Sequence, residues 1–293
     1  MPPAYLFWVP VLIWASTWHV ILYQLGQVPP LNSVAYRFVL ATLVLLAIVR
    51  WRGESLRFTL REHALLALTG ALQYALNYWA IYVAEQYIPS GLVAVLFTLM
   101  VFGNAATGAL FLGQPVTRRF ALATAAGVLG VVLIFWPEIV ATGARPHAGL
   151  GLALGLLAVG AAVTGNLLTL RLSAALKPRG IGLVPLLATS MGYGALLLLA
   201  LSLATTGFAM DWRPSYLASL AYLAVCGSVV AFLLYFQLAQ RVGPARASLM
   251  AIVIPVIALA VSAALEGYRP PPLAWAGMAA CLASVWVATR PAA

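Results

Sequence analysis

The 293-residue chain has few acidic residues and few charges of any kind. It contains 6 Asp and Glu against 16 Lys and Arg, so that 8% of its residues are charged and 64% are hydrophobic. Soluble domains contain about 25% charged and about 45–50% apolar residues. This composition excludes a water-soluble enzyme and predicts that the chain lies in a lipid bilayer. Because spanning helices would use most of the chain, too few residues remain for a soluble domain.

The groups needed for catalysis are also scarce. The one aspartate is Asp211, and the three histidines lie in three separate segments, so no nucleophile, base and orienting acid can be assigned together. Cys226 and Cys281 have neither metal-binding nor redox spacing. We therefore expect no catalytic residues, no metal and no cofactor. The basic residues are scattered rather than gathered in one patch, which argues against nucleic acid as a partner.

Long apolar runs fill most of the chain, and their length indicates helices, because barrel strands would be about ten residues long. The runs cover residues 4–25, 32–49, 64–84, 90–112, 119–136, 148–170, 181–205, 215–239, 245–265 and 273–289. A spanning helix needs roughly 20 apolar residues. The sequence therefore predicts an all-α membrane protein with ten transmembrane helices.

The distribution of Lys and Arg predicts the orientation. Twelve of them lie in alternate connections and in the carboxyl tail, against three in the remaining connections, while Arg37 falls inside the second run. The twelve are Arg50, Arg52, Arg57, Arg61, Arg118, Arg119, Arg171, Lys177, Arg179, Arg241, Arg246 and Arg290. We expect both termini on the cytoplasmic side, which requires an even number of spans.

The chain resembles itself when it is shifted by about 155 residues. The third run ends in a Tyr-rich segment before Pro89, and the eighth ends similarly before Pro244. Five spans in each half make the second half enter the membrane from the opposite side. We expect two inverted repeats, residues 1–140 and 141–293, with a substrate site where they meet and access that alternates between the two sides.

These features carry a resemblance to a known family. The ten apolar runs, the two five-helix repeats, the Trp14–Trp18 segment, Arg37 and the Gly113-Gln114-Pro115 turn resemble the drug/metabolite transporter superfamily. Within it, the chain is similar to the EamA-type exporters and most of all to the YddG type of aromatic amino acid exporter. Gln114 stands where many members have Glu, which leaves that turn structural.

The resemblance implies a bacterial inner-membrane exporter of aromatic and other neutral amino acids. Amino acids would then be its small-molecule partners, and no obligate protein partner is implied. Three alternatives stay open: an exporter of drugs or other metabolites, an importer of the same fold, and a membrane receptor or enzyme that transports nothing.

The third run offers the richest candidate site. Tyr74, Tyr78 and Tyr82 recur every four residues and so share one side of a helix, with Asn77 beside them. Unpaired amides are costly in hydrocarbon, so these side chains should face protein or a water-filled cavity. We predict substrate contacts for Asn77, Tyr78 and Tyr82, against the alternative of interhelical bonding and an interfacial aromatic belt.

The first run places Trp14, Thr17 and Trp18 on one side, halfway along the span and too deep for a surface belt. We predict that they line the same cavity. His19 points elsewhere and is the one titratable residue near a midplane, so it is a possible proton site or a neutral histidine bonded to a neighbouring helix. Six further candidates would either line this cavity or pack between helices: Phe97, Met100, Asn104, Asn166, Phe232 and Tyr235.

The carboxylates bear on energy coupling. Glu85, Glu138 and Glu266 are predicted at outer span ends, and Glu54 and Glu62 in a cytoplasmic connection, so no carboxylate is expected at the midplane. Proton-driven antiporters usually depend on such a group. The absence of a Lys or Arg cluster inside the spans also argues against phosphorylated substrates.

Overall fold

The computed structural model describes residues 4–24, 26, 28–88, 90–142, 146–265 and 270–289, and in these ranges the chain forms helices and connecting turns with no strand. The helices are α1 (Tyr5–Ile21), η1 (Leu22–Gln24), α2 (Pro30–Arg52), α3 (Leu60–Gly70), η2 (Ala71–Leu76), α4 (Asn77–Ala84), α5 (Ser90–Thr98), α6 (Met100–Leu112), α7 (Arg118–Ile134), α8 (Trp136–Thr142), α9 (Ala148–Leu176), η3 (Lys177–Arg179), α10 (Leu183–Thr205), α11 (Pro214–Ala224), η4 (Val225–Val230), α12 (Ala231–Val242), α13 (Pro244–Ala247), α14 (Met250–Leu265) and α15 (Pro272–Thr289).

The helices begin and end at residues suited to those places. Thr59 caps α3, its hydroxyl accepting from the Glu62 backbone while the Glu62 carboxylate accepts from the Thr59 backbone. Pro30 opens α2, and Gly53 ends it with φ of 63°. Gly113 ends α6 at φ of 64°. The predicted Gly-Gln-Pro turn is therefore a left-handed helix stop followed by the Thr117 cap of α7.

Seven helical stretches in the described residues are long and apolar enough to cross a membrane. They are Pro30–Arg52, Leu92–Leu112, Ala148–Arg179, Leu183–Thr205, Pro214–Val242, Pro244–Val261 and Pro272–Thr289. Helices α1 and α7 have 17 residues each. The continuous helix from α3 through η2 to α4 carries Gln73, Asn77 and several tyrosines, which make it less apolar than the others.

Corresponding elements recur along the chain. Both η2 and η4 are six-residue π-helical segments, and η4 begins at Val225, 154 positions after η2 begins at Ala71. The same shift relates the starts of α3 and α11, of α5 and α13, and of α7 and α15. The expected boundary between residues 140 and 141 falls inside the short helix α8, which the sequence did not predict.

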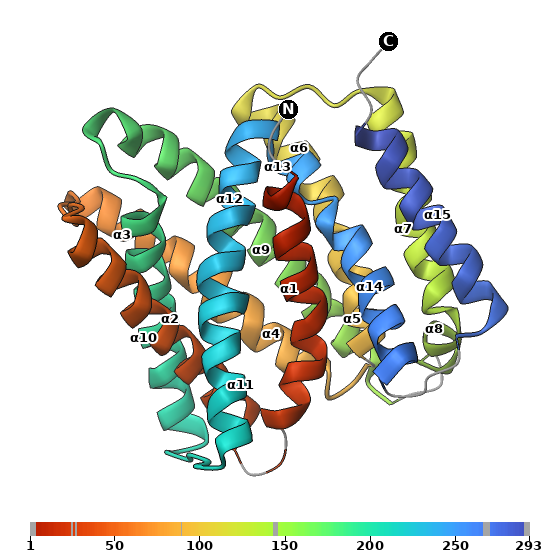
Figure 1. The fold of residues 1–293 in the computed structure, drawn as a ribbon, viewed down its shortest axis with the longest axis horizontal. Helices are drawn as coiled ribbons and strands as arrows, with labels where there is room; N and C mark the ends of the chain where they lie inside the picture. Colours follow the sequence, from red (N-terminus) through yellow and green to blue (C-terminus); the bar gives the residue numbers. More distant parts are fainter. Residues whose placement is uncertain are drawn as a thin grey trace.

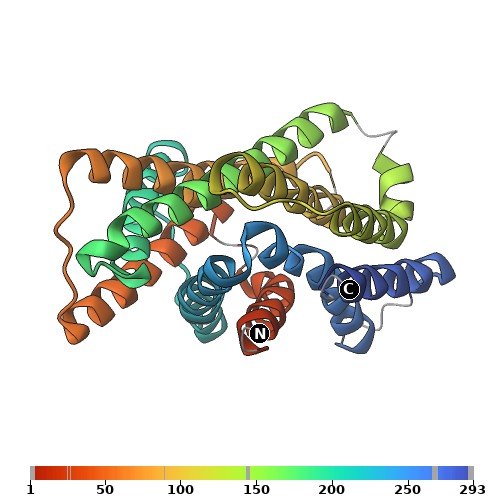
Figure 2. The same cartoon turned by 90° about the horizontal axis from the view of Figure 1, so that it is seen from above.

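Two helix pairs flank the centre of the bundle. Helix α2 packs along α10 at one side, and α7 packs along α15 at the other (Figure 1). Between them lie α1, α4, α9 and α12. Seen from above, α1 is placed between α12 and α14 (Figure 2), and it packs against both. Elements from the two ends of the sequence therefore meet in the middle of the molecule.

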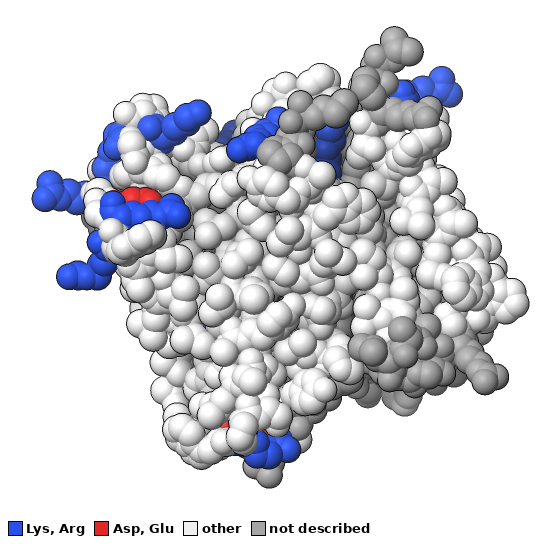
Figure 3. Space-filling model, viewed as in Figure 1, with Lys and Arg blue, Asp and Glu red and all other residues white. Residues whose placement is uncertain are grey.

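Charge is concentrated at the two ends of the bundle. Most Lys and Arg gather at the end that holds the α2–α3, α6–α7 and α9–α10 connections, and few lie at the opposite end (Figure 3). We call the first of these the basic end. Helix α1 begins and α15 finishes at this same end (Figure 1). The face between the two ends shows a wide band without charged residues, as a lipid-facing surface requires.

Candidate substrate-binding site

Helix α1 is joined to the π segment η4 through Trp14. Its indole nitrogen donates a hydrogen bond of 3.1 Å to the carbonyl of Gly227. The indole ring also lies 5.5 Å from the Phe232 ring and 5.8 Å from the Tyr235 ring, measured between centroids. Trp14 stays partly exposed. The structure thus brings three predicted site residues together.

Arg37 of α2 reaches the same π segment. Its Nε donates to Ser228 Oγ at 2.8 Å, and its Nη2 donates to the Gly227 carbonyl at 3.3 Å. The guanidinium carbon lies 5.4 Å from the Tyr78 ring centroid and 5.6 Å from that of Phe38. Arg37 is 5% exposed. A cation is therefore held inside the bundle, against the face of a predicted site tyrosine.

Aromatic rings extend from this cation toward α12. Phe38 contacts Tyr78 edge-on at 4.8 Å and Tyr74 at 5.3 Å, and Tyr74 contacts Phe232 edge-on at 5.4 Å. Edge-to-face contacts at these separations stabilise by about 0.5–1.5 kcal/mol beyond the buried area. Tyr74 and Phe38 are fully buried, whereas Tyr78 is partly exposed. Of the tyrosine stripe, Tyr74 is a packing residue and Tyr78 keeps an accessible face.

A set of hydrogen-bonded polar side chains lies beside this aromatic cluster. We call it the amide–phenol network. Asn166 Nδ2 donates to the Tyr235 hydroxyl at 3.1 Å, and Asn104 Nδ2 donates to Ser248 Oγ at 2.5 Å. Gln73 Nε2 donates to Asn166 Oδ1 at 3.3 Å. All five residues are buried. The predicted candidates Asn104, Asn166 and Tyr235 thus bond to one another across α6, α9 and α12.

Of the other candidates of the first half, Asn77 and Met100 contact this network. Asn77 is buried and donates to the Gln73 carbonyl, while its Oδ1 bonds to no described residue. Tyr82, Phe97 and Met100 are partly exposed. Met100 Sδ accepts a weak bond from the Asn166 amide at 3.7 Å. Partly exposed aromatic and sulfur-containing side chains offer the kind of surface that an apolar group can contact.

The remaining α1 candidates divide. Thr17 is buried and donates to the Trp14 carbonyl at 2.6 Å. His19 is partly exposed, and its ring lies edge-on to that of Tyr23 at 5.8 Å. The side chain of Trp18 lies outside the described residues, so its place in the site stays a prediction.

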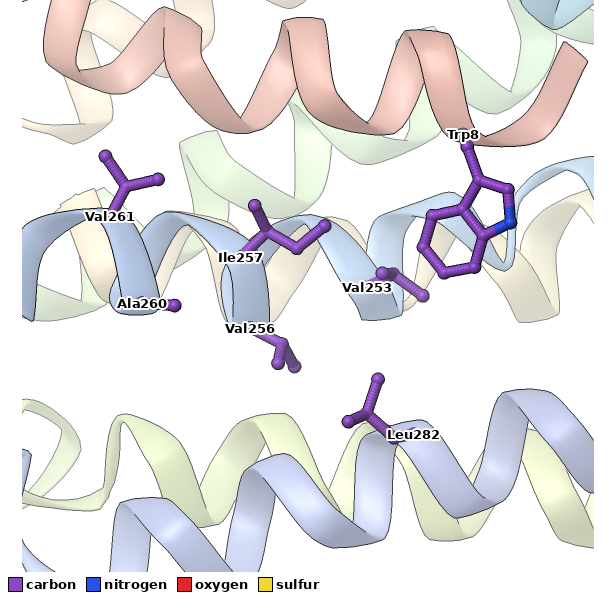
Figure 4. A pocket seen from close by; sticks show the side chains of 7 residues that line it. All are labelled: Trp8, Val253, Val256, Ile257, Ala260, Val261 and Leu282. Atoms are coloured by element: carbon purple, nitrogen blue, oxygen red, sulfur yellow. The ribbon is translucent and has the colours of Figure 1, made fainter. Parts of the chain in front are cut away.

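Two hollows lie away from the aromatic cluster. A groove of about 530 Å³ is lined by Trp8 of α1, Leu282 of α15 and five apolar residues of α14 (Figure 4). Its lining is almost wholly apolar, as expected where lipid tails cover a helix bundle. A second hollow of about 340 Å³ lies at the Gly113–Thr117 turn and Arg246. Within the described residues, no group of three His, Cys, Asp or Glu is placed to bind a metal.

Sequence reasoning left Arg37 and Phe38 out of the site. Arg37 did carry a signal, because a lone charge inside an apolar run is a functional candidate by itself. Phe38 carried none, since a single phenylalanine in an apolar helix is an ordinary core residue. Gly227 was left out as well, because it acts through a backbone carbonyl inside a π-helical segment, a backbone form that is frequent at functional sites and cannot be read from the sequence.

A helix bundle with charged ends, an uncharged middle band and polar, aromatic side chains in its interior defines an integral membrane protein. The sequence profile of the EamA-like transporter family matches residues 1–136 and again residues 149–290. The chain belongs to the EamA-like transporter family. Its class is therefore that of a membrane transporter, and the double match coincides with the two halves of the chain.

Individual relatives are more distant. The chain is 29% identical over 284 residues to the "Uncharacterized inner membrane transporter YedA" of Escherichia coli, covering 95% of this chain and 87% of that protein. It is 25% identical to "Protein PecM" of Dickeya dadantii, over 84% of this chain and 78% of that one. A "Probable biotin transporter" of Pseudomonas aeruginosa is 36% identical over 140 residues, or 46% of each chain.

The fold has also been seen in a solved structure. A crystal structure superposes with a TM-score of 0.77 over 97% of this chain and 96% of its own, at 14% sequence identity. At this identity the likeness concerns the fold alone. These comparisons show the family of the chain but not its substrate. They do not show the expected resemblance to the YddG type of aromatic exporter, so the substrate has to be inferred from the site.

Proposed function

We propose that the protein is an inner-membrane exporter of neutral amino acids, the aromatic ones among them, that works by alternating access. The observation that carries this proposal is the partly exposed aromatic surface of Trp14, Tyr78, Tyr82 and Phe97, where helices of both halves meet. Such rings suit apolar side chains of varied size. The site offers no carboxylate for a lipophilic cation among the described residues.

The proposal includes ten spans arranged as two inverted halves. Helices α1 and α7, with 17 residues each, are at the short end of the length that crosses a bilayer. The continuous helix over residues 60–84 supplies the third span beyond the seven apolar ones. The 154-residue recurrence of η2 and η4 and the two family matches support the repeat. Because each half has an odd number of spans, five, the second half begins on the opposite side of the membrane and the repeat is inverted.

The proposed location is the bacterial inner membrane, with the basic end and both termini in the cytoplasm. The excess of Lys and Arg at one end supports this orientation. The relative YedA is named as an inner membrane transporter, which supports the location. A single cysteine at Trp212, which is 74% exposed, should react from outside, and one at Arg118 should not. Both variants are made in a protein whose native Cys226 and Cys281 have been replaced. Labelling of the cysteine at position 118 from outside, and not of the one at position 212, would overturn the orientation.

The polar groups fit a zwitterion. The Oδ1 of Asn77 and the Oε1 of Gln73 are buried acceptors that bond to no described residue. A buried acceptor without a partner costs about 1–3 kcal/mol, and the α-ammonium group of an amino acid would supply the missing donors. An aromatic wall beside amide oxygens therefore suits a substrate with an apolar body and a positive head.

Coupling to protons is not required by this arrangement. His19 remains the proposed proton site if transport is coupled, because the described acidic residues lie at helix ends or in connections. Without coupling, the protein would equilibrate amino acids down their gradients. The direction of net flux then follows the cytoplasmic excess of substrate.

A second candidate is transport of biotin or a similar carboxylic acid. The observation favouring it is the similarity of nearly half of the chain to a protein named as a probable biotin transporter. Biotin has no ammonium group, and the two N–H groups of its ureido ring would be the donors that it offers to the Asn77 and Gln73 oxygens. A drug exporter stays open as well, and transport unaffected by neutralising every Glu would remove it.

The decisive experiment uses purified protein in liposomes preloaded with unlabelled amino acid. We expect labelled phenylalanine, methionine or threonine to exchange across the membrane faster than in protein-free liposomes. Absence of exchange with every amino acid, together with transport of labelled biotin, would replace the first candidate by the second. Absence of any flux would indicate a protein that does not transport these solutes.

A further inference from the structure

Arg37 is a buried charge that the hydrogen bonds of the protein satisfy only in part. A guanidinium has five N–H donors, and the structure uses one on Nε and one on Nη2. The other three bond to no described residue. Both occupied donors lie along the edge that faces Ser228 and Gly227, so the edge formed by Nη1 and Nη2 is left for another acceptor.

No described carboxylate neutralises this charge. The ion pairs formed by described residues are Arg52–Glu54, Arg179–Glu62 and Arg213–Asp211, all in connections or at helix ends. Removing an ion from water costs several kcal/mol unless an opposite charge or good hydrogen bonds offset it. Two neutral acceptors and the rings of Phe38 and Tyr78 offset part of this cost. An anion is the partner that would offset the rest.

The surroundings place that anion in the candidate site. Arg37 and Trp14 donate to the same Gly227 carbonyl, and the guanidinium lies against the Tyr78 ring. Thr17 is on the same side, because a Cβ built on Gly227 would lie 3.2 Å from Arg37 Nη2 and 3.3 Å from the Thr17 methyl group. A group bound at the open edge of Arg37 would thus be next to three residues of the predicted cavity.

We propose that Arg37 binds the carboxylate of the transported substrate through its Nη1–Nη2 edge, and that the substrate class is a monocarboxylate with an apolar body. This inference rests on the proposed function because it uses the same cavity. It does not depend on which candidate substrate is correct, because a neutral amino acid and biotin both carry a carboxylate. A carboxylate matches the planar fork of Arg in a bidentate manner. Ser228 and Gly227 hold the other edge and are positioning groups.

The first test needs no variant. Phenylalanine, 3-phenylpropionate and phenylalaninamide share one apolar body; the second lacks the ammonium group and the third lacks the carboxylate. As competitors of labelled phenylalanine exchange, the two carboxylates should inhibit, and phenylalaninamide should be at least about tenfold weaker, equivalent to about 1.4 kcal/mol. Equal inhibition by phenylalaninamide and phenylalanine would overturn the proposal.

The second test assigns the effect to Arg37. Arg37→Gln should raise the KM for phenylalanine about tenfold or more and remove the preference for carboxylates, while Arg37→Lys should keep part of it, because lysine retains the charge but not the fork. Arg50→Gln is the matched control, since Arg50 is exposed in the same helix. An Arg37→Gln protein with unchanged KM and unchanged preference for carboxylates would contradict the proposal. If Arg37→Gln does not fold, the same comparison is made with Arg37→Lys, whose KM should lie above that of the wild-type protein.

The third test separates this inference from the amino acid assignment. The thermal unfolding midpoint of the purified protein is measured with 3-phenylpropionate, biotin and the amide of each. If no amino acid exchanges, stabilisation by an acid but not by its amide, lost in Arg37→Gln, would support Arg37 while the proposed function fails. Equal effects of acid and amide on the wild-type protein would overturn the role of Arg37.

Discussion

The side-chain amide of Asn104 in α6 donates a hydrogen bond of 2.5 Å to the hydroxyl of Ser248, between α13 and α14. The two residues are 144 positions apart and belong to different halves of the chain. Asn104 is fully buried and also approaches the Tyr235 hydroxyl at 3.4 Å. The amide–phenol network therefore ties the two halves together.

Removing Asn104 should loosen this connection. We expect Asn104→Ala to lower the free energy of unfolding by about 1–3 kcal/mol, because it removes the donor to Ser248 Oγ and one acceptor of the Asn166 amide, and leaves Ser248 only its bond to the Pro244 carbonyl. The thermal unfolding midpoint of the purified protein should fall by several degrees. Thr164→Val is the control, since Thr164 is exposed and bonds within its own helix to Gly160. Equal midpoints for the two variants would show that the network adds no stability.

The sequence predicted the helices better than the site because the two depend on different information. Apolar runs and their Pro and Gly boundaries are local signals, and α2, α10 and α15 begin within two residues of the expected positions. The break between α5 and α6 at Leu99 and the π segments η2 and η4 were not predicted. They change the backbone register without a Pro or a change in hydrophobicity, so composition does not reveal them.

The site depends on contacts between residues far apart in the chain. The tyrosine period correctly placed Tyr74 and Tyr78 on one side of a helix, yet burial separates them: Tyr74 is enclosed by Phe38 and Phe232, and Tyr78 keeps an exposed face. The pairing of Arg37 with Gly227 spans 190 positions. Nothing in a single sequence indicates which helix will stand opposite a given residue.

The contact between α7 and α15 depends on glycine. A Cβ on Gly130 would lie 2.8 Å from both the Gly277 carbonyl oxygen and Cys281 Sγ, so Gly130→Ala must push the helices apart. We expect a loss of about 1–3 kcal/mol in unfolding free energy. Gly160→Ala is the matched control, because nothing lies within 4 Å of its Cβ position, and it should be neutral or stabilise by up to about 1 kcal/mol. Equal destabilisation by both would contradict the close packing of α7 and α15.

The ion pair between Glu62 and Arg179 should make stability depend on pH. The guanidinium of Arg179, hydrogen-bonded to Glu62, holds the pKa of that carboxyl below its ordinary value of 4.5. A lowered pKa in the folded state means that the pair stabilises above the unfolded pKa, and that this contribution is lost as the pH falls through the lowered value.

Glu62→Gln isolates this effect, because glutamine at this position can still accept the Thr59 cap bond. Exposed pairs are worth about 0–1 kcal/mol, so the wild-type protein should unfold at a slightly higher temperature than the variant near pH 7. The difference should shrink as the pH is lowered below about 4.5 and should also shrink in high salt. A difference that grows on acidification would show that the charge of Glu62 does not stabilise the fold.

Tyr78 tests whether the exposed aromatic face binds substrate. Its ring packs against Phe38 and lies over the Arg37 guanidinium, so Tyr78→Phe keeps the ring while Tyr78→Ala removes it. We expect Tyr78→Ala to raise the KM for phenylalanine about tenfold and Tyr78→Phe to change it little, since a cation–π contact contributes about 0.5–2 kcal/mol when partly desolvated. The exposed Tyr5 in α1 provides the control variant Tyr5→Ala. Because the ring holds Arg37 in place from one side, loss of the carboxylate preference should accompany the change in KM; a Tyr78→Ala protein with wild-type KM would place the substrate elsewhere in the bundle.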